Sequence, residues 1–284
     1  MPNLYATIFE GLMYALLAWT LPRAWRAEGA AGVQRVLAGI AYGLLLEEAT
    51  IRQLRAYTYG RFWVMVTDDV PLAIGVGWGL ILNAAWLYTR GLAHPSWLMR
   101  ATVGALWALT IDLAMDVVAI RLGFWDWGFG LDFDFFGVPW ANFWAWFWVV
   151  GGYLAMLEGL QRLGWGIAAI RPWLAVSSVA LVLLTNALIT QVVPRAGYRP
   201  TVAAVLLAAL AWTGLARGWR RVRAVPQESQ IIQAAFHGYF TLAGLISGAL
   251  FRPPALLVVA ALAAGLGFAL THQPPHAKMQ DEDG

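Results

Sequence analysis

The stretch ATVGALWALTIDLAMDVVAIRL, residues 101–122, carries two acids and one arginine in an otherwise uncharged run. A helix needs about 20 consecutive, mainly apolar residues to cross the hydrocarbon core of a bilayer. This stretch has that length, so it predicts a transmembrane helix. Its two acids, Asp112 and Asp116, are four positions apart and therefore lie on one face of that helix.

Further apolar runs lie on both sides of this stretch. They cover residues 4–21, 34–52, 70–89, 139–160, 172–192, 201–216, 231–250 and 254–271. The runs at 201–216 and 254–271 are short. The last two runs, 231–250 and 254–271, could instead form a hairpin that enters the bilayer without crossing it. We expect an all-α, polytopic transmembrane helical bundle of about eight or nine spans. It would form a single membrane domain over residues 1–271, followed by a disordered tail at 272–284.

The composition supports a membrane protein and excludes several other classes. The chain has 284 residues, of which 60% are hydrophobic and 12% charged, whereas soluble domains carry about 25% charged residues. The net charge of +3 comes from basic residues placed singly in short loops, so we expect no nucleic-acid partner. The absence of cysteine excludes disulfides, thiol catalysis and iron–sulfur clusters. With only four histidines as well, we expect no metal and no cofactor.

The distribution of arginine and lysine predicts the orientation. With the N-terminus outside, twelve basic residues fall in inside segments and seven in outside segments, which is the bias that the positive-inside rule favours. The first run begins at Leu4 with no basic residue before it, so we interpret it as a retained helix. We expect a protein integral to the cytoplasmic (inner) membrane, with its N-terminus outside and its C-terminus inside.

The N-terminal half contains a tandem repeat. Two segments match without gaps at an offset of 68 residues, each with an acid, an aromatic-x-aromatic-Gly motif, Val-Pro and Trp. The copies are Glu48, Tyr57, Tyr59, Gly60, Val70, Pro71 and Trp78, and Asp116, Trp125, Trp127, Gly128, Val138, Pro139 and Trp146. We expect residues 34–160 to form a duplicated catalytic unit of four helices. Residues 161–271 are expected to be scaffold, because their candidate helices contain no acid.

Several acids fall inside these predicted spans. An acidic side chain at the centre of the bilayer costs about 2.5–3.5 kcal/mol on insertion scales, and such groups usually face the bundle interior and serve function. The alternative is a carboxyl that is neutral, or paired with Arg52 or Arg121, and only joins helices. Glu10 stands alone in its helix and fits this alternative better. The candidate catalytic residues are Asp112, Asp116, Glu48 and Glu47. We expect Asp112, Asp116 and Glu48 to line a single cavity walled by tryptophan and tyrosine.

Aromatic residues gather between the fourth and fifth predicted helices. Residues 124–148 contain thirteen of them in twenty-five positions. They could form an interfacial anchor or the aromatic entrance of a cavity. The candidate substrate-binding residues are Tyr57, Tyr59, Trp78, Trp125, Trp127, Asn142 and Trp146.

Buried acids among aromatic rings suit one kind of chemistry. Two nearby carboxyls in an apolar site cannot easily ionise together, so one keeps its proton. Such an acid can protonate an unactivated C=C bond. Aromatic faces then stabilise the resulting carbocation, and a second carboxylate can orient a water or remove a proton. An enzyme acting on an isoprenoid double bond meets these requirements, and so does a proton-coupled transporter.

These motifs resemble a known family. The runs DLAMDVVAIRLGFWDWG and FFGVPWANFWAWF, with YTYGRF and DVPLAIGVGW, resemble the membrane family of carotenoid biosynthesis proteins over roughly residues 40–150. Its characterised members are carotenoid 1,2-hydratases, namely gamma-carotene 1′,2′-hydratases and bisanhydrobacterioruberin hydratases. The chain departs from the family at Val117 and Val118, where a proline is usual, at Asp69, where glycine often precedes Val-Pro, and at Ala145, where glycine is frequent.

The resemblance implies a hydro-lyase that adds water, without a cofactor, to the terminal 1,2 double bond of an acyclic (ψ) carotenoid end group. The family's Asp-x-x-x-Asp falls on Asp112 and Asp116. Its other motifs fall on Trp125, Trp127 and Gly128, and on Gly137, Val138, Pro139, Asn142 and Phe143. The implied partners are a lipophilic polyene or isoprenoid substrate, water and membrane lipid.

Other functions remain open at this point. A cyclase or isomerase would use the same acid but would have to exclude water. A proton-coupled carrier or a lipid-binding membrane protein would need no chemistry. An intramembrane prenyltransferase is disfavoured, because a second aspartate-rich motif is missing. The sequence predicts no oligomeric state.

Overall fold

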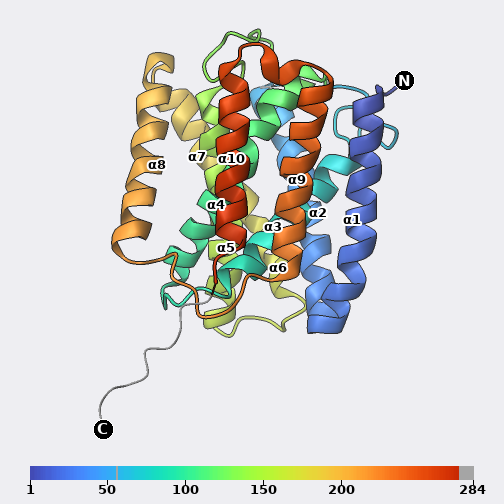
Figure 1. Ribbon diagram of the computed structural model, residues 1–284. Coiled ribbons are helices and arrows are strands. Elements are labelled where there is room, and N and C mark those ends of the chain that lie inside the picture. The colour runs from blue at the N-terminus through green and yellow to red at the C-terminus, as the bar shows by residue number, and fades with distance from the viewer. Residues whose placement is uncertain (56, 275–284) are drawn as a thin grey trace.

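Helices make up most of the chain in the computed structural model, which describes residues 1–55 and 57–274 (Figure 1). They are α1 (Leu4–Glu28), α2 (Ala30–Leu54), α3 (Leu72–Thr89), α4 (Trp97–Arg121), α5 (Trp140–Arg162), α6 (Arg171–Ala175), α7 (Val179–Val192), α8 (Tyr198–Leu215), α9 (Gln227–Ile246) and α10 (Ala255–Thr271). Three 3₁₀ turns are η1 (Val176–Ser178), η2 (Arg195–Gly197) and η3 (Ala249–Phe251). Two short strands, β1 (Thr58–Tyr59) and β2 (Trp125–Asp126), complete the described elements. The predicted all-α fold class is confirmed.

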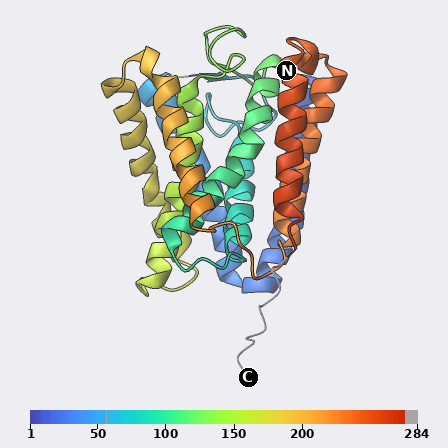
Figure 2. The same ribbon diagram turned by 60° about the vertical axis from the view of Figure 1, so that its left-hand side comes forward.

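The long helices form a membrane bundle. In the described residues, six segments are long and apolar enough to cross a bilayer. They are Leu4–Glu28, Leu72–Thr89, Trp97–Arg121, Trp140–Arg162, Arg171–Val192 and Arg195–Leu215. Helices α2, α9 and α10 run beside them along the same axis (Figures 1 and 2). The protein is therefore a polytopic membrane protein.

The predicted span at 172–192 is not one continuous helix. It consists of α6, the turn η1 and α7. The hydroxyls of Ser177 and Ser178 donate to the carbonyls of Leu174 and Ala175, both at 2.7 Å. Serine hydroxyls that bond back to the preceding turn compete with the regular helical pattern. The segment therefore tightens into a 3₁₀ turn that the hydrophobic run does not reveal.

The first two helices are longer than their apolar runs. They meet at Gly29, whose φ of 59° lies in the left-handed region that glycine adopts readily. Polar side chains line this end of both helices. Arg35 of α2 pairs with Glu28 of α1 at 2.7 Å and donates to Asn83 of α3 at 2.9 Å. Hydropathy predicts only the apolar part of a helix. It therefore does not predict helix ends that are stabilised by contacts between polar side chains.

The duplicated segments pack together as a four-helix unit. Helix α2 packs on α3, α4 packs on α5, and α3 contacts both α4 and α5. Strands β1 and β2 pair antiparallel, with Thr58 opposite Asp126. Thr58 and Asp126 are the middle residues of the two aromatic-x-aromatic motifs. The Trp78 and Trp146 rings, which are also equivalent, lie 4.5 Å apart. Equivalent residues therefore meet each other, as expected for two parallel repeats related by rotation about the bundle axis.

Within the first copy, α2 and α3 cross at two glycines. A Cβ added to Gly79 would lie 2.5 Å from Cγ1 of Ile40 and 2.9 Å from the backbone oxygen of Val36. A Cβ added to Gly39 would lie 3.0 Å from Cα of Gly79. Small residues allow membrane helices to approach closely in this way.

This crossing gives a testable prediction. We expect Gly79→Ala to destabilise the protein by about 1–3 kcal/mol, because the added methyl group forces the two helix backbones apart. The measurement is thermal unfolding in detergent. Gly238→Ala is the matched control, because Gly238 is also helical and has nothing within 4 Å of its added Cβ. Equal melting temperatures for the two variants would contradict the close crossing.

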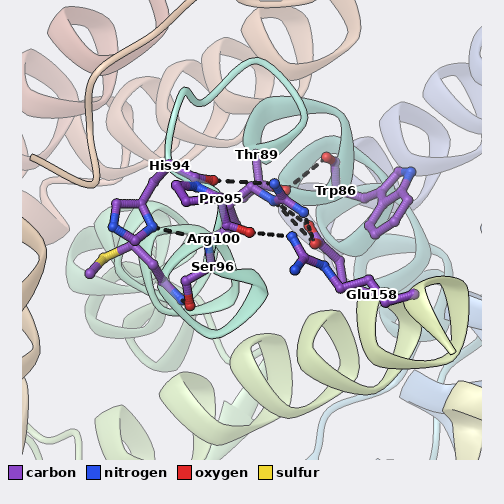
Figure 3. Close-up of polar contacts among 9 residues, drawn as sticks. Trp86, Thr89, His94, Pro95, Ser96, Arg100 and Glu158 are labelled. Carbon is purple, nitrogen blue, oxygen red and sulfur yellow. Dashed lines mark hydrogen bonds and ion pairs between the residues drawn. The ribbon is translucent and has the colours of Figure 1, made fainter.

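An ion pair joins α4 and α5 of the second copy. It lies at the end of the bundle away from the loop between these helices, residues 122–139, which we call the aromatic loop. Arg100 of α4 pairs with Glu158 of α5, and its Nε donates to Oε1 of Glu158 at 2.9 Å (Figure 3). Arg100 also donates to the His94 carbonyl at 3.3 Å, and Ser96 caps the start of α4. Because Arg100 and Glu158 pair with each other, we assign them a structural role rather than a catalytic one.

The last two helices form an antiparallel pair against α4. Helix α10 contacts both α9 and α4, and α9 also contacts α1 and α3. Both run along most of the height of the bundle (Figures 1 and 2). The predicted disordered tail, 272–284, lies outside the described residues apart from 272–274.

Candidate functional site

A cavity of about 600 Å³ lies inside the bundle. This volume is within the range of about 300–1,000 Å³ that is usual for small-molecule sites. Helices α2, α3, α4, α5 and α7 and the aromatic loop form most of its wall. Most of the lining is apolar or aromatic, and a small number of polar groups converge on the space. Those from the helices include Glu47, Asp116, Asn142, Asn186, Thr190 and Gln191.

Glu47 lies in the cavity wall with its carboxylate held by three donors. Trp78 Nε1 donates to Oε1 at 2.7 Å, and the Tyr59 hydroxyl donates to Oε2 at 2.8 Å. The Tyr57 hydroxyl also donates to Oε2. Glu47 is 5% exposed, so these bonds replace the water that an ionised carboxylate would otherwise require. A carboxyl that only accepts hydrogen bonds is stabilised in its charged form.

The second acid group is the aspartate pair on α4. Asp116 lines the cavity, whereas Asp112 lies behind it and is fully buried, so the prediction that Asp112 lines the cavity is wrong. Pro139 precedes α5 and places Asn142 in its first turn. The Asn142 amide donates to Asp116 Oδ2 at 2.6 Å and to both Asp112 oxygens at 3.2 Å. One amide therefore bonds to both carboxyls, which lie on one face of α4.

Glu48 occupies a different place from the one predicted. It pairs with Arg52 one turn along α2 and accepts from the Thr67 hydroxyl at 2.9 Å, and it does not line the cavity. Successive residues on a helix point about 100° apart, so Glu47 faces inward and Glu48 does not. The prediction that Glu48 lies in the same cavity as Asp116 is therefore wrong, and Glu47 takes that place.

Glu10 has a structural role, in line with the sequence. Its two carboxylate oxygens accept the backbone N–H groups of Trp63 and Val64 at 2.7 and 2.8 Å. It also accepts from the Tyr14 hydroxyl at 2.8 Å. Glu10 thus holds the loop before α3 against α1, and both of its carboxylate oxygens accept hydrogen bonds in doing so.

The aromatic-x-aromatic motifs form one wall of the cavity. The Tyr57 ring lies 4.6 Å from the Trp127 ring, and the Tyr59 ring lies 5.8 Å from the Trp125 ring, both edge to face. Removal from water and the neighbouring Glu47 carboxylate raise the pKa of Tyr57 and Tyr59 well above the ordinary value. Both phenols therefore stay protonated and remain donors to Glu47 through the neutral range.

Two tryptophans from the two copies line the cavity side by side. Trp78 and Trp146 have ring centroids 4.5 Å apart with planes inclined at 43°, and both belong to the lining. The negatively polarised faces of such rings attract cations. The seven predicted substrate-binding residues thus all reach this cavity.

The aromatic loop covers the end of the cavity that lies at the start of α5. Phe129 and Phe133 line the cavity, and the guanidinium of Arg195 lies 4.4 and 5.3 Å from their ring centroids. The loop is therefore fastened to η2 by cation–π contacts. This arrangement favours the cavity entrance over a simple interfacial anchor.

Helix α7 also contributes to the cavity, although residues 161–271 were expected to be scaffold. Asn186 and Ile189 of α7 line the cavity, and so does Phe236 of α9. A single asparagine on an apolar helix forms no motif that would indicate a binding site. Helix α7 also contains no acidic residue, which was the feature used to select candidate site helices. This part of the chain therefore also shapes the site.

Comparison with known proteins is decisive for the family. Residues 3–215 match the family described as carotenoid biosynthesis protein. The chain belongs to the carotenoid biosynthesis protein family. No curated protein and no solved structure matches it. The family match runs from α1 to the end of α8, so it includes every acid in the cavity wall and leaves out α9 and α10.

Membership in the carotenoid biosynthesis family confirms the resemblance drawn from the motifs and extends it along the chain. A role in carotenoid biosynthesis follows.

Proposed function

We propose that this protein is a carotenoid 1,2-hydratase, which adds water to the terminal double bond of an acyclic (ψ) end group. One observation carries the proposal. Asp116 and Glu47 line one aromatic cavity in different environments, because Asp116 shares the Asn142 amide with the buried Asp112, whereas Glu47 accepts from three side chains. Pairs of acids in contrasting environments are how enzymes assign one acid and one base.

The aspartate pair supplies the proton. Asp112 and Asp116 are one helical turn apart, share the Asn142 amide and are buried in a bundle of low dielectric constant. Two carboxylates so placed cannot both be ionised without a large cost, so the pair keeps one proton between them. Asp116 faces the substrate space and is the donor, while Asp112 helps to hold the shared proton.

Glu47 supplies the negative charge. The three side chains that donate hydrogen bonds to its carboxyl group favour its ionised form. An ionised carboxylate stabilises a nearby carbocation and can accept a proton from water as the C–O bond forms. The Trp78 and Trp146 rings add the attraction of their faces for the same cation.

The reaction balances with these groups alone. The π electrons of the double bond take the proton of Asp116, which forms a C–H bond at the less substituted carbon and a tertiary cation at the other. The oxygen of a water molecule then forms the C–O bond, and Glu47 takes the proton released from that water. Transfer of this proton through water to the aspartate pair restores the starting state. The product is a tertiary alcohol, and no redox partner is needed.

The polar part of the cavity favours hydration over cyclisation or isomerisation. The side chains of Asn186, Thr190 and Gln191 extend the polar lining from the acids along α7. A cyclase has to keep water away from its cation, whereas this wall offers hydrogen-bonding groups that can hold water. The aromatic loop then separates this water from the bulk solvent.

The reaction can be tested by pigment analysis. We expect a host that makes acyclic carotenoids to accumulate a more polar product, heavier by one water molecule, when it expresses this protein. The measurement is liquid chromatography with mass spectrometry, compared with an empty-vector host. A cyclic product of unchanged mass would replace the hydratase by a cyclase, and unchanged pigment would favour a carrier or a lipid-binding protein.

We further propose an orientation in the cytoplasmic (inner) membrane. Helix α1 begins and α10 ends at opposite ends of the bundle (Figure 1). The bias of arginine and lysine supports an N-terminus outside and a C-terminus inside. The aromatic loop would then lie at the outer surface, and the lipophilic substrate would reach the cavity from the membrane.

A further inference from the structure

Asn186 differs from the other polar groups that line the cavity. It lies on α7, its side chain is 5% exposed, and its Oδ1 has no hydrogen-bond partner among the described residues. By contrast, Glu47 accepts from three side chains, and the Asn142 amide is committed to the two aspartates. The carbonyl oxygen of Asn186 is therefore a buried acceptor in this wall that none of the described residues uses.

The neighbours of Asn186 on α7 do not supply a partner. The Thr190 hydroxyl donates to the backbone oxygen of Asn186 at 2.7 Å, and the Thr185 hydroxyl donates to that of Val182 at 3.0 Å. Ile189 and Val182, which lie on the same side of the helix, are apolar and buried. Leaving a buried polar group without a hydrogen-bond partner is unfavourable. A ligand in the cavity would remove this cost.

We propose that Asn186 is a positioning residue, which holds and aims the water that captures the carbocation. This inference rests on the hydration proposed above. The Oδ1 atom accepts one hydrogen of the water, which leaves an oxygen lone pair of the water free to form the C–O bond. The neutral amide cannot take up the released proton, so that proton goes to Glu47. Asn186 thus fixes the direction of attack without altering the acid chemistry.

The test separates protonation of the substrate from capture of the cation. In D₂O, protonation followed by loss of a proton puts deuterium into recovered substrate, whereas capture gives the alcohol. We expect Asn186→Leu, which nearly keeps the volume, to reduce alcohol formation by about tenfold or more, about 1.4 kcal/mol of barrier. Deuterium should still enter the recovered carotenoid, because protonation needs no positioned water.

Two further variants control for the structure. Asn186→Asp keeps a carbonyl oxygen at the same position and should restore part of the alcohol formation. Thr185→Val removes a hydroxyl that is bonded only to its own helix and should leave the ratio of alcohol to deuterium exchange unchanged. These results, with folding checked by size-exclusion chromatography in detergent, would support the inference.

Two outcomes would overturn it. One is alcohol formation by Asn186→Leu within about threefold of the wild-type rate, less than about 1 kcal/mol of barrier. The other is loss of both alcohol and deuterium exchange in Asn186→Leu with no recovery in Asn186→Asp, which would indicate a structural role. Failure of the hydratase proposal would be recognised separately, because the wild-type protein would then form no alcohol.

Discussion

Replacing Asp116 by asparagine is expected to remove nearly all hydration activity. The side chain keeps its shape, and its amide oxygen can still accept the hydrogen bond that Asn142 donates at 2.6 Å. The acidic proton is lost, and general acid catalysis is worth about 10²–10⁴-fold in rate. Alcohol formation and deuterium exchange should fall together, since neither occurs without protonation. The measurement is the initial rate of both reactions in membranes or detergent.

The control for this variant is the same substitution at an exposed position. Asp132 lies in the aromatic loop and is exposed, so Asp132→Asn should keep close to the wild-type rate. Expression and carotenoid retention should be similar in all three proteins, because Asp116→Asn changes neither volume nor packing. If Asp116→Asn still hydrated within about tenfold of wild type, about 1.4 kcal/mol of barrier, Asp116 would not be the acid.

The sequence was sufficient to predict the membrane helices because their physical cause is local. An apolar run of bilayer length has to be a helix, since no water is present to satisfy an open backbone. The interruption at η1 was not predictable in this way. It depends on the hydroxyls of Ser177 and Ser178 bonding to their own backbone, and the same residues would also fit a regular helix.

The repeat was predictable from residue types, and its geometry was only partly so. Matching Glu48 with Asp116 pairs α2 with α4. It did not indicate which acid of α2 faces the cavity, because this depends on the rotation of the helix about its axis. The donors Tyr57, Tyr59 and Trp78 select Glu47, and they come together only when β1 and α3 are in place.

Asn186 illustrates a different limit. A single amide on an apolar helix is as consistent with a contact between helices as with a binding site. Its significance comes from the absence of a partner for Oδ1 in the described structure and from the cavity that it lines. Both are properties of the packed bundle, and no spacing along the chain encodes them.

Glu47→Gln is expected to have an effect comparable to that of Asp116→Asn. The neutral amide cannot stabilise the cation, and its NH₂ group would face one of the donors that now contact the carboxylate, Tyr57, Tyr59 or Trp78. Removing one such electrostatic contribution in other enzymes costs about 10²–10³-fold in rate. Because the cation itself becomes harder to form, deuterium exchange should fall with alcohol formation, in contrast to Asn186→Leu.

The adjacent residue gives a matched control for this prediction. Glu48→Gln makes the same chemical change one position along α2, but it affects an ion pair with Arg52 that is partly exposed and lies outside the cavity. Such pairs contribute only about 0–1 kcal/mol to stability, so Glu48→Gln should hydrate at nearly the wild-type rate. A large loss in Glu48→Gln together with an active Glu47→Gln would reverse the assignment. The carboxylate selected by the repeat would then be the functional one, despite its position outside the cavity.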